Sequence, residues 1–354
     1  MRKLCFDAPC RLLVAALIAA IVAVPSFLGP TPAFAVDVDL ESQLREALRD
    51  AQANSGAPGM SISVVTADGR QWSGAAGRHT DGRLVMIDDP LMIGSVTKTF
   101  TAAIVLALVD EGRIQLDAPT AAYLPNVALV RGTTVRQLLN HTSGIADLYR
   151  PAKEVLHGAP GATLSSNAVL HPIGPAYFAP GTGYAYSNTN YYLLGLIIEV
   201  VTGRSFGEEL QARFTGPLGL EHTRLLTAAD PQLPAAWSTA FWTSGAMVSR
   251  PSELARWGHA LYGGAVLSGP SLRRMLDFRS GHLYGEGAQL LRIGDHRFVG
   301  HSGLLYETTT YLVRLAGVTV AIAGTAPHTD LGAALTEGYS GRPSLLELIG
   351  RLAG

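Results

Sequence analysis

Cysteine and lysine are both scarce in this chain of 354 residues. The two cysteines, Cys5 and Cys10, stand near the amino terminus, and the ten histidines form neither an H-E-x-x-H motif nor a Cys/His spacing typical of zinc sites. We therefore expect no metal ion and no other cofactor. Only three of the 27 basic residues are lysine, namely Lys3, Lys98 and Lys153. Arginine cannot give up its proton in a protein and a desolvated lysine can, so each lysine is a candidate for acid–base chemistry.

Charge is sparse and balanced. Charged residues make up 16% of the chain, with 27 basic against 28 acidic residues, and no run of Lys or Arg is long enough to form a basic patch. A nucleic acid or an anionic membrane needs such a patch, so we expect neither as a partner. Hydrophobic residues make up 47% of the chain, which predicts a folded globular protein with a large core.

The first 35 residues are typical of a secretory signal peptide. Arg2, Lys3 and Arg11 precede an apolar stretch over 12–24, and an A-x-A cleavage site ends at Ala35. An uncleaved membrane anchor is the alternative, but this stretch is shorter than the roughly 20 residues that a spanning helix needs. We expect a mature chain that is secreted or held at the cell surface, with no membrane span, no disulfide and no cysteine nucleophile.

Hydrophobic periodicity predicts an α/β (α+β) fold. The expected helices include 39–54, 96–111, 134–140, 191–202 and 344–352. The expected strands are 59–65 and 71–75, which form a hairpin, and 297–300, 308–314 and 318–324. This order predicts an antiparallel sheet flanked by helices and built from both chain ends. The predicted domains are a signal peptide (1–35), a sheet domain (36–116 and 240–354) and an inserted, mainly helical domain (117–239).

The motif Ser95-Val96-Thr97-Lys98 stands at the start of a strongly predicted helix. Positions i and i+3 share one helix face, so the Ser95 hydroxyl and the Lys98 amine can come within hydrogen-bonding reach. The helix amino terminus adds positive potential and a backbone N–H at Ser95, both of which stabilise an oxyanion. A neutral Lys98 can accept the serine proton, which makes Ser95 a candidate nucleophile. The alternative is a helix-capping serine followed by a solvated lysine.

Two further motifs can carry chemistry. In Tyr186-Ser187-Asn188 the first and third side chains point the same way if the loop is extended. The phenol can shuttle a proton if nearby positive charge lowers its pKa, and the amide can orient Lys98 or the substrate. In His301-Ser302-Gly303, the imidazole offers a donor or a pH-dependent charge, and the glycine allows close approach. An aromatic-rich turn and a structural histidine are the respective alternatives.

The three motifs, in this order, resemble the penicillin-recognising serine hydrolases of the class C β-lactamase-like family, whose sister enzymes carry S-x-x-K, S-D-N and K-T-G. The similarity is greatest to the D-alanyl-D-alanine carboxypeptidases of actinomycetes. The matching blocks are IGSVTKTF (93–100), LVDEG (108–112), YLP (123–125), YAYSNTN (184–190), SGAMVS (244–249) and GHSG (300–303). The resemblance extends from about residue 56 to residue 324. It implies a β-lactamase/transpeptidase-like fold.

The resemblance also implies a role for each motif residue. Ser95 would be the acylated nucleophile and Lys98 its proton acceptor. Tyr186 would be the general acid/base for the leaving group and for water. Asn188 would orient the reacting groups, and His301 would stand in the place usually held by lysine.

The late motif would bind the substrate. The resemblance implies an oxyanion hole made of the backbone N–H groups of Ser95 and Leu304, with Ser302 and Gly303 beside the substrate. Leu304 departs from the family, because the carboxypeptidases tend to carry a small hydroxyl residue there that helps hold the terminal carboxylate. Arg292 is a candidate for the arginine expected near that carboxylate.

The predicted function is that of an exported serine hydrolase that acts through an acyl-enzyme at Ser95. A D-alanyl-D-alanine carboxypeptidase of cell-wall peptides is the first candidate, and His301 argues against a dedicated β-lactamase. The alternatives are an esterase or broad amidase on the same scaffold and a non-catalytic penicillin-binding domain. The expected partner is a small molecule or peptide, namely a D-alanyl peptide, an ester or a β-lactam, and the oligomeric state is left open.

Three other features are interpreted as structural. The sequence GRSFG (203–207) matches a nucleophile elbow, but it follows a predicted helix, and Ser205 with Glu208 is better explained as a capping box. His141 begins an H-T-S-G sequence that is expected to be a turn. Lys153 is expected to be solvated in a loop.

Overall fold

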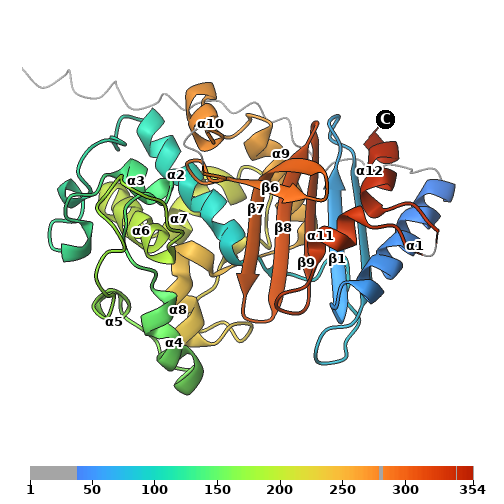
Figure 1. Ribbon diagram of the computed structural model, residues 1–354, viewed down its shortest axis with the longest axis horizontal. Coiled ribbons are helices and arrows are strands. Elements are labelled where there is room, and N and C mark those ends of the chain that lie inside the picture. The colour runs from blue at the N-terminus through green and yellow to red at the C-terminus, as the bar shows by residue number, and fades with distance from the viewer. Residues whose placement is uncertain (1–37, 279–281, 340, 354) are drawn as a thin grey trace, which may run out of the picture. The chain divides into compact units, whose positions relative to one another are not determined.

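The computed structural model describes residues 38–278, 282–339 and 341–353 (Figure 1). The expected signal peptide lies outside them. The helices are α1 (Val38–Asn54), α2 (Thr97–Asp110), α3 (Val135–Leu139), α4 (Tyr149–Gly158), α5 (Ser166–Leu170), α6 (Asn188–Thr202), α7 (Phe206–Leu210), α8 (Ala235–Gly245), α9 (Pro251–Tyr262), α10 (Gly269–Met275), α11 (Leu331–Thr336) and α12 (Leu345–Ala353). The strands are β1 (Gly59–Val65), β2 (Gln71–Gly77), β3 (Leu91–Met92), β4 (Arg224–Leu225), β5 (Met247–Ser249), β6 (Gln289–Ile293), β7 (His296–Leu305), β8 (Thr308–Leu315) and β9 (Val318–Gly324). Short 3-10 turns are η1 (Gly94–Val96), η2 (Thr120–Ala122) and η3 (Ala128–Val130), and η4 (Gln211–Thr215) is a turn of π-helix.

Six strands form one antiparallel sheet in the order β2-β1-β9-β8-β7-β6. The amino-terminal hairpin therefore joins the carboxyl-terminal strands, and Met60 of β1 lies opposite Gly324 of β9. Every residue of β1 is buried, whereas β2 alternates between buried and half-buried residues, as expected for a central strand beside an edge strand. The predicted antiparallel sheet, built from both chain ends, is confirmed.

Helices cover both faces of this sheet. α9 packs against β1, β8 and β9, and α1 packs against β2 and α12. The neighbouring residues Leu312 and Val313 of β8 belong to different apolar clusters, the first with residues of α9 and the second with residues of α1 and α12. Because successive residues of a strand point to opposite faces, α9 and α1 cover opposite sides of the sheet.

The helix α2 lies at the centre of the helical part, where it packs against α6, α8 and α10 (Figure 1). All residues from 97 to 106 are buried, so this part of the helix is enclosed by protein on every side. The turn η1 precedes α2 directly and packs against β7 and β8. The start of α2 is thus held between the helices and the carboxyl-terminal strands of the sheet.

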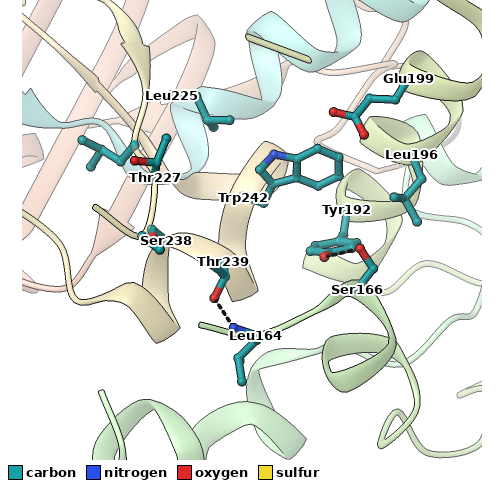
Figure 2. Close-up of a pocket in the computed structure, with 12 residues that line it drawn as sticks. Leu164, Ser166, Tyr192, Leu196, Glu199, Leu225, Thr227, Ser238, Thr239 and Trp242 are labelled. Atoms are coloured by element: carbon teal, nitrogen blue, oxygen red, sulfur yellow. Dashed lines mark hydrogen bonds between the residues drawn. The ribbon is translucent and has the colours of Figure 1, made fainter. Parts of the chain in front are cut away.

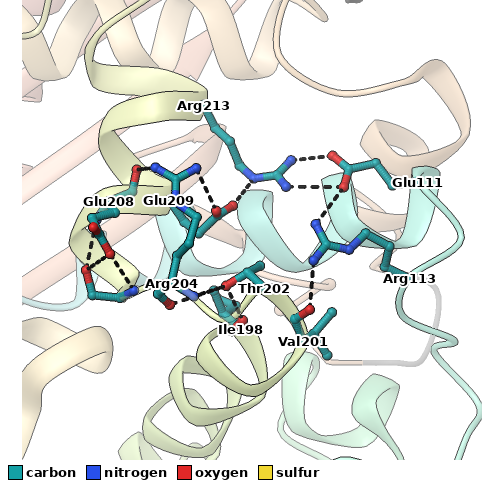
Figure 3. Close-up of polar contacts among 10 residues, drawn as sticks. Glu111, Arg113, Ile198, Val201, Thr202, Arg204, Glu208, Glu209 and Arg213 are labelled. Carbon is teal, nitrogen blue, oxygen red and sulfur yellow. Dashed lines mark hydrogen bonds and ion pairs between the residues drawn. The ribbon is translucent and has the colours of Figure 1, made fainter. Parts of the chain in front are cut away.

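An ionic network fixes the other end of α2 (Figure 3). Glu111, which follows the last residue of α2, pairs with both Arg113 and Arg213. Arg113 also donates to the carbonyl oxygen of Val201 in α6 at 2.7 Å, and Arg213 pairs with Glu209 of α7 at 2.6 Å. The network joins α2, α6 and α7, so the helix that follows the candidate nucleophile is anchored at both ends.

The segment 117–239 contains α3 to α7, together with short turns and the strand β4. β4 pairs with β5, which also pairs with β3, so a small second sheet connects this segment to both flanking parts. The division into a signal peptide (1–35), a sheet domain (36–116 and 240–354) and a helical domain (117–239) stays a prediction. Within the described residues, no helix is long and apolar enough to cross a membrane.

Candidate active site

Ser95 lies in η1, between the strand β3 and the helix α2. The preceding Gly94 has φ +51°, and a Cβ atom at this position would lie 2.7 Å from the backbone nitrogen of Leu304. Glycine is required here because no side chain fits between this turn and β7. Ser95 makes no helix-capping bond, since Ile93 and Val96 are the residues that precede η1 and α2. The close approach of the two segments places Ser95 beside the end of β7.

Lys98 is fully buried and makes three polar contacts. Its Nζ atom lies 3.0 Å from Ser95 Oγ, 2.7 Å from Asn188 Oδ1 and 2.7 Å from the carbonyl oxygen of Ser244. The last two atoms can only accept, so they take both hydrogens of a neutral amine and leave its lone pair for the Ser95 hydroxyl. Burial lowers the pKa of Lys98 from 10.5 to about 7, against the opposing effect of the Asp147 carboxylate. Lys98 is therefore arranged to accept the serine proton.

Asp147, which the sequence motifs do not reveal, fixes the orientation of Asn188. Asp147 Oδ2 accepts from the backbone nitrogen of Asn188 at 2.5 Å and from its Nδ2 atom at 3.0 Å. Because the amide nitrogen is bound to the carboxylate, the amide oxygen must face Lys98. Asn188 is the first residue of α6, whose N-cap is Ser187, and its side-chain oxygen is an acceptor for the Lys98 amine.

The Tyr186 phenol lies beside the serine and the lysine. Lys98 Nζ is 4.9 Å from the centre of the Tyr186 ring, and the Ser95 hydroxyl is within hydrogen-bonding reach of the phenol. Burial raises the pKa of Tyr186 above its ordinary value of 10, and this effect exceeds the opposing effect of Ser95. The shift is opposite to the one considered from the sequence. Tyr186 therefore rests as a protonated phenol and can donate a proton.

His301 is fully buried in β7 and is neutral near pH 7. Burial lowers its pKa from 6.5 to about 3, with a further contribution from Lys98. Its Nδ1 atom lies 2.6 Å from the carbonyl oxygen of Ser302, which can only accept, so Nδ1 carries the proton. Its Nε2 atom then accepts from the Tyr284 hydroxyl at 2.9 Å. A pH-dependent charge on His301 was one expectation from the sequence. The buried environment disfavours the charged imidazolium near neutral pH.

The structure adds His141 to the site, although the H-T-S-G sequence predicts only a turn. The residue follows α3 with φ +61°, so the turn itself is present. The ring lies 4.4 Å from that of Tyr186, and its Nδ1 atom accepts from the backbone nitrogen of Ser187 at 3.2 Å. Nε2 is buried without a hydrogen-bond partner among the described residues. His141 therefore holds the loop that carries Tyr186 and Asn188.

The end of β7 supplies the Leu304 backbone group of the predicted oxyanion hole. The backbone nitrogen of Ser302 donates to Gln289 Oε1 of β6 at 2.9 Å. Residues two apart in a strand direct their N–H groups to the same edge, so the N–H of Leu304 also points away from β8 and towards Gly94. A Cβ atom on Gly303 would overlap the carbonyl oxygen of Ile93. The N–H groups of Ser95 and Leu304 can therefore converge on one oxygen atom.

The structure does not bring Arg292 to this edge. Arg292 is exposed and lies opposite Arg297, four residues before His301 in β7, which is a distance of about 13 Å along a strand. The side chain beside Ser302 is the uncharged Gln289, whose Oε1 atom also accepts from the Ser302 hydroxyl at 3.0 Å. Leu304 itself is 44% exposed. The leaving-group side of the site is therefore lined by uncharged groups at these positions.

The remaining sequence interpretations are resolved by local structure. Ser205 and Glu208 form a capping box at the start of α7, as expected, and no strand precedes Ser205 directly. Lys153 is exposed, but it lies in α4 and not in a loop. Neither residue takes part in the site.

Comparisons with known proteins identify the family of this chain. A profile of the family described as Beta-lactamase matches residues 44–338. The chain belongs to this family, which includes the penicillin-recognising serine hydrolases.

Curated relatives include penicillin-binding protein 4 of Amycolatopsis lactamdurans, 33% identical over 175 residues that cover 48% of this chain and 45% of that protein. A D-aminopeptidase of Brucella anthropi is 30% identical over 297 residues, which cover 75% of this chain and 55% of that protein. The chain thus spans about half the length of these relatives.

Similar solved structures include a D-stereospecific amidohydrolase from a Streptomyces species, with a TM-score of 0.72 and 28% identity over 85% of this chain and 98% of that one. The D-amino acid amidase of Ochrobactrum anthropi SV3 has a TM-score of 0.76 and 23% identity, and covers 89% of this chain and 100% of that one. The second likeness shows the fold alone.

Proposed function

We propose that this chain is a serine hydrolase that forms an acyl-enzyme at Ser95. The observation that carries the proposal is the environment of Lys98. Asn188 Oδ1 and the Ser244 carbonyl bind its two amine hydrogens, burial lowers its pKa to about 7, and Ser95 Oγ lies 3.0 Å away. A serine hydroxyl is a weak nucleophile until a neighbouring base takes its proton.

In the acylation step, the Ser95 proton moves to Lys98 Nζ while Ser95 Oγ bonds to the substrate carbonyl carbon. The negative charge that develops on the carbonyl oxygen is stabilised by the N–H groups of Ser95 and Leu304. The bond to the leaving group then breaks, and the Tyr186 phenol donates the proton that the leaving nitrogen or oxygen needs. The phenolate recovers its proton from the Lys98 ammonium.

Deacylation uses the same groups. Water attacks the ester carbon and gives one proton to the neutral amine of Lys98, because the Tyr186 phenol is already protonated. The bond between the carbon and Ser95 Oγ breaks, and Ser95 regains its proton. His301 keeps Ser302 and Tyr284 in place as a neutral donor and acceptor. No step requires His301 to change charge.

The substrate class that we propose is an amide or ester of a D-amino acid with an uncharged leaving group. Gln289 and Leu304 line the leaving-group side, and Arg292 lies about 13 Å further along the strand. The relatives described as a D-aminopeptidase and a D-stereospecific amidohydrolase support the same choice.

The carboxypeptidase expected from the sequence is the second candidate. It is favoured by the matching blocks around Ser95 and Tyr186 and by the relative described as a penicillin-binding protein. In that case the protein would be exported and would release D-alanine from cell-wall peptides. A non-catalytic penicillin-binding domain is a third possibility, which the complete set of reacting groups disfavours.

Two measurements test this proposal. A fluorescent penicillin should label the wild-type protein covalently and should not label Ser95→Ala, whereas Ser205→Ala, which changes the serine of the GRSFG sequence, should be labelled normally. Release of ammonia from D-alanine amide is then compared with release of D-alanine from an acyl-D-Ala-D-Ala peptide. Faster turnover of the peptide would establish the carboxypeptidase instead. If the penicillin labels the protein but neither substrate is hydrolysed, the protein is a non-catalytic penicillin-binding domain.

A further inference from the structure

A cavity of about 290 Å³ lies among α5, α6, α8 and the segment that follows β4 (Figure 2). Much of its wall is apolar and is formed by Leu164, Leu196, Leu225 and the rings of Tyr192 and Trp242. None of the residues proposed for catalysis lines it. Because an apolar cavity of about 150 Å³ holds a benzene ring, this one has room for a small aromatic compound with a short polar arm.

Glu199 is the charged residue among the described side chains that line this cavity. One of its carboxylate oxygens, Oε1, accepts from the backbone nitrogen of Phe206 at 3.0 Å. Figure 2 shows the carboxylate on the side of the Trp242 ring. A carboxylate beside aromatic faces attracts cations, since the ring faces and the carboxylate are both negative. An ammonium group is therefore the polar arm that this wall favours.

The backbone of Trp242 supports a ligand-binding role. Its φ and ψ angles are 28° and −116°, which interrupt the helical conformation inside α8. Such angles are unfavourable for a bulky residue, and conformations of this kind concentrate at ligand sites and active sites. The ring lies 5.1 Å from that of Tyr192, at an angle of 62°. The kink thus directs an indole ring into the cavity wall.

We propose that this cavity is a second ligand site, which binds a small organic ammonium ion with an aromatic or alkyl body. The ammonium group would lie between Glu199 and Trp242, and the apolar body would pack against the leucine side chains. This site is separate from Ser95 and does not depend on the reaction proposed there.

Isothermal titration of the protein with 2-phenylethylammonium tests the proposal, with the uncharged 2-phenylethanol as a matched probe. The wild-type protein should bind the ammonium at least about five-fold more tightly than the alcohol, as expected for a partly desolvated cation beside a carboxylate and an aromatic ring. Glu199→Gln should abolish this preference. The glutamine keeps an oxygen that accepts from Phe206, so the variant should fold, and its thermal unfolding checks this.

Glu154→Gln, which removes an exposed carboxylate from α4, is the control and should keep the preference. A crystal structure with the ammonium bound should show it against Trp242. Absence of binding, equal affinity for the two probes, unchanged affinity in Glu199→Gln, or a ligand located at Ser95 would each overturn the proposal.

Discussion

Asp147 accepts two hydrogen bonds from Asn188, one from its backbone and one from its side chain. This pairing turns the Asn188 oxygen towards Lys98, which in turn faces Ser95. The carboxylate also raises the pKa of Lys98. Asp147 thus acts on the proposed base in two ways, through orientation and through charge, without touching the serine.

Replacing Asp147 separates these two effects. In Asp147→Asn the negative charge near Lys98 is lost, so the pKa of Lys98 should fall further and the acidic limb of kcat/KM should move to lower pH. The rate at the plateau should fall by about 10-fold or more, because Asn188 loses its charge-assisted partner. Asp295→Asn, on the exposed turn between β6 and β7, should leave both properties unchanged. An unshifted limb in Asp147→Asn would contradict the electrostatic role.

Lys98 should make the stability of the protein depend on pH in a defined window. Its pKa is about 7 in the folded protein and 10.5 in the unfolded chain, so the unfolded chain binds more protons between these values. Stability must therefore rise with pH there, by about 1.4 kcal/mol per pH unit. In denaturant unfolding between pH 7 and pH 10, the free energy of unfolding of the wild type should increase by this amount per pH unit relative to that of Lys98→Met. If the free energies of unfolding of the wild type and of Lys98→Met changed with pH in parallel, Lys98 would not be desolvated.

The same amine sets the pH dependence of the proposed reaction. Below pH 7 Lys98 is protonated and cannot accept the Ser95 proton, so kcat/KM should decrease about ten-fold per pH unit in stopped assays. Lys98→Arg should be inactive throughout, because a guanidinium does not give up its proton. Activity of Lys98→Arg above 1% of wild type would contradict the role of Lys98 as the base.

The pH profile of kcat/KM should show no limb from His301 between pH 5 and pH 9. Its folded pKa is about 3, so it stays neutral in this range, and His301→Gln should lower kcat/KM without shifting the profile. The unfolded chain binds a proton at this residue below about pH 6.5 and the folded protein does not. Wild-type stability should therefore be lost as pH falls from 6.5 towards 3, and less steeply in His301→Gln. A kinetic limb near pH 6.5 that disappears in the variant would show that the ring titrates during the reaction.

Gln289 should decide whether a charged leaving group is accepted. An arginine at this position would place a cation beside Ser302, where a terminal carboxylate could bind it. Gln289→Arg should raise the rate on an acyl-D-Ala-D-Ala peptide relative to D-alanine amide by about 10-fold, which corresponds to one charge-assisted hydrogen bond. Gln211→Arg, on an exposed turn, is the matched control. If Gln289→Arg left the ratio of the two rates unchanged, the leaving group would not bind beside residue 289.

The parts of the site that are local in sequence were the predictable ones. Ser95 and Lys98 are three residues apart on one helical turn, and Tyr186 and Asn188 are two apart on one loop, so spacing alone indicates that each pair can act together. The central helix and the antiparallel sheet followed from apolar periodicity in the same way. β6 was not predicted because it is short and its burial does not alternate: three residues are half-buried, Arg292 is exposed and Ile293 is buried.

The parts that depend on tertiary contacts could not be found from spacing. Asp147 stands 41 residues before Asn188, and nothing in its own neighbourhood marks it as a partner. Tyr284 reaches His301 from the segment before β6. His141 did carry a signal, because it begins the H-T-S-G sequence, but a turn is a sufficient explanation of that sequence. Its second role became visible only when Ser187 and Tyr186 were placed against its ring.

The pairing of β1 with β9 joins residues about 260 positions apart, and the strand that carries Gly303 and Leu304 belongs to the same late group. Contacts of such long range make folding slow, since the chain must close a large loop before they form. The turn that carries Ser95, the proposed nucleophile, is synthesised early, but the backbone edge that faces it forms only after the last strands are made. A ribosome-bound or truncated chain that ends before β7 would hold Ser95 and Lys98 but would lack the Leu304 N–H of the proposed oxyanion hole, so we expect it to be inactive.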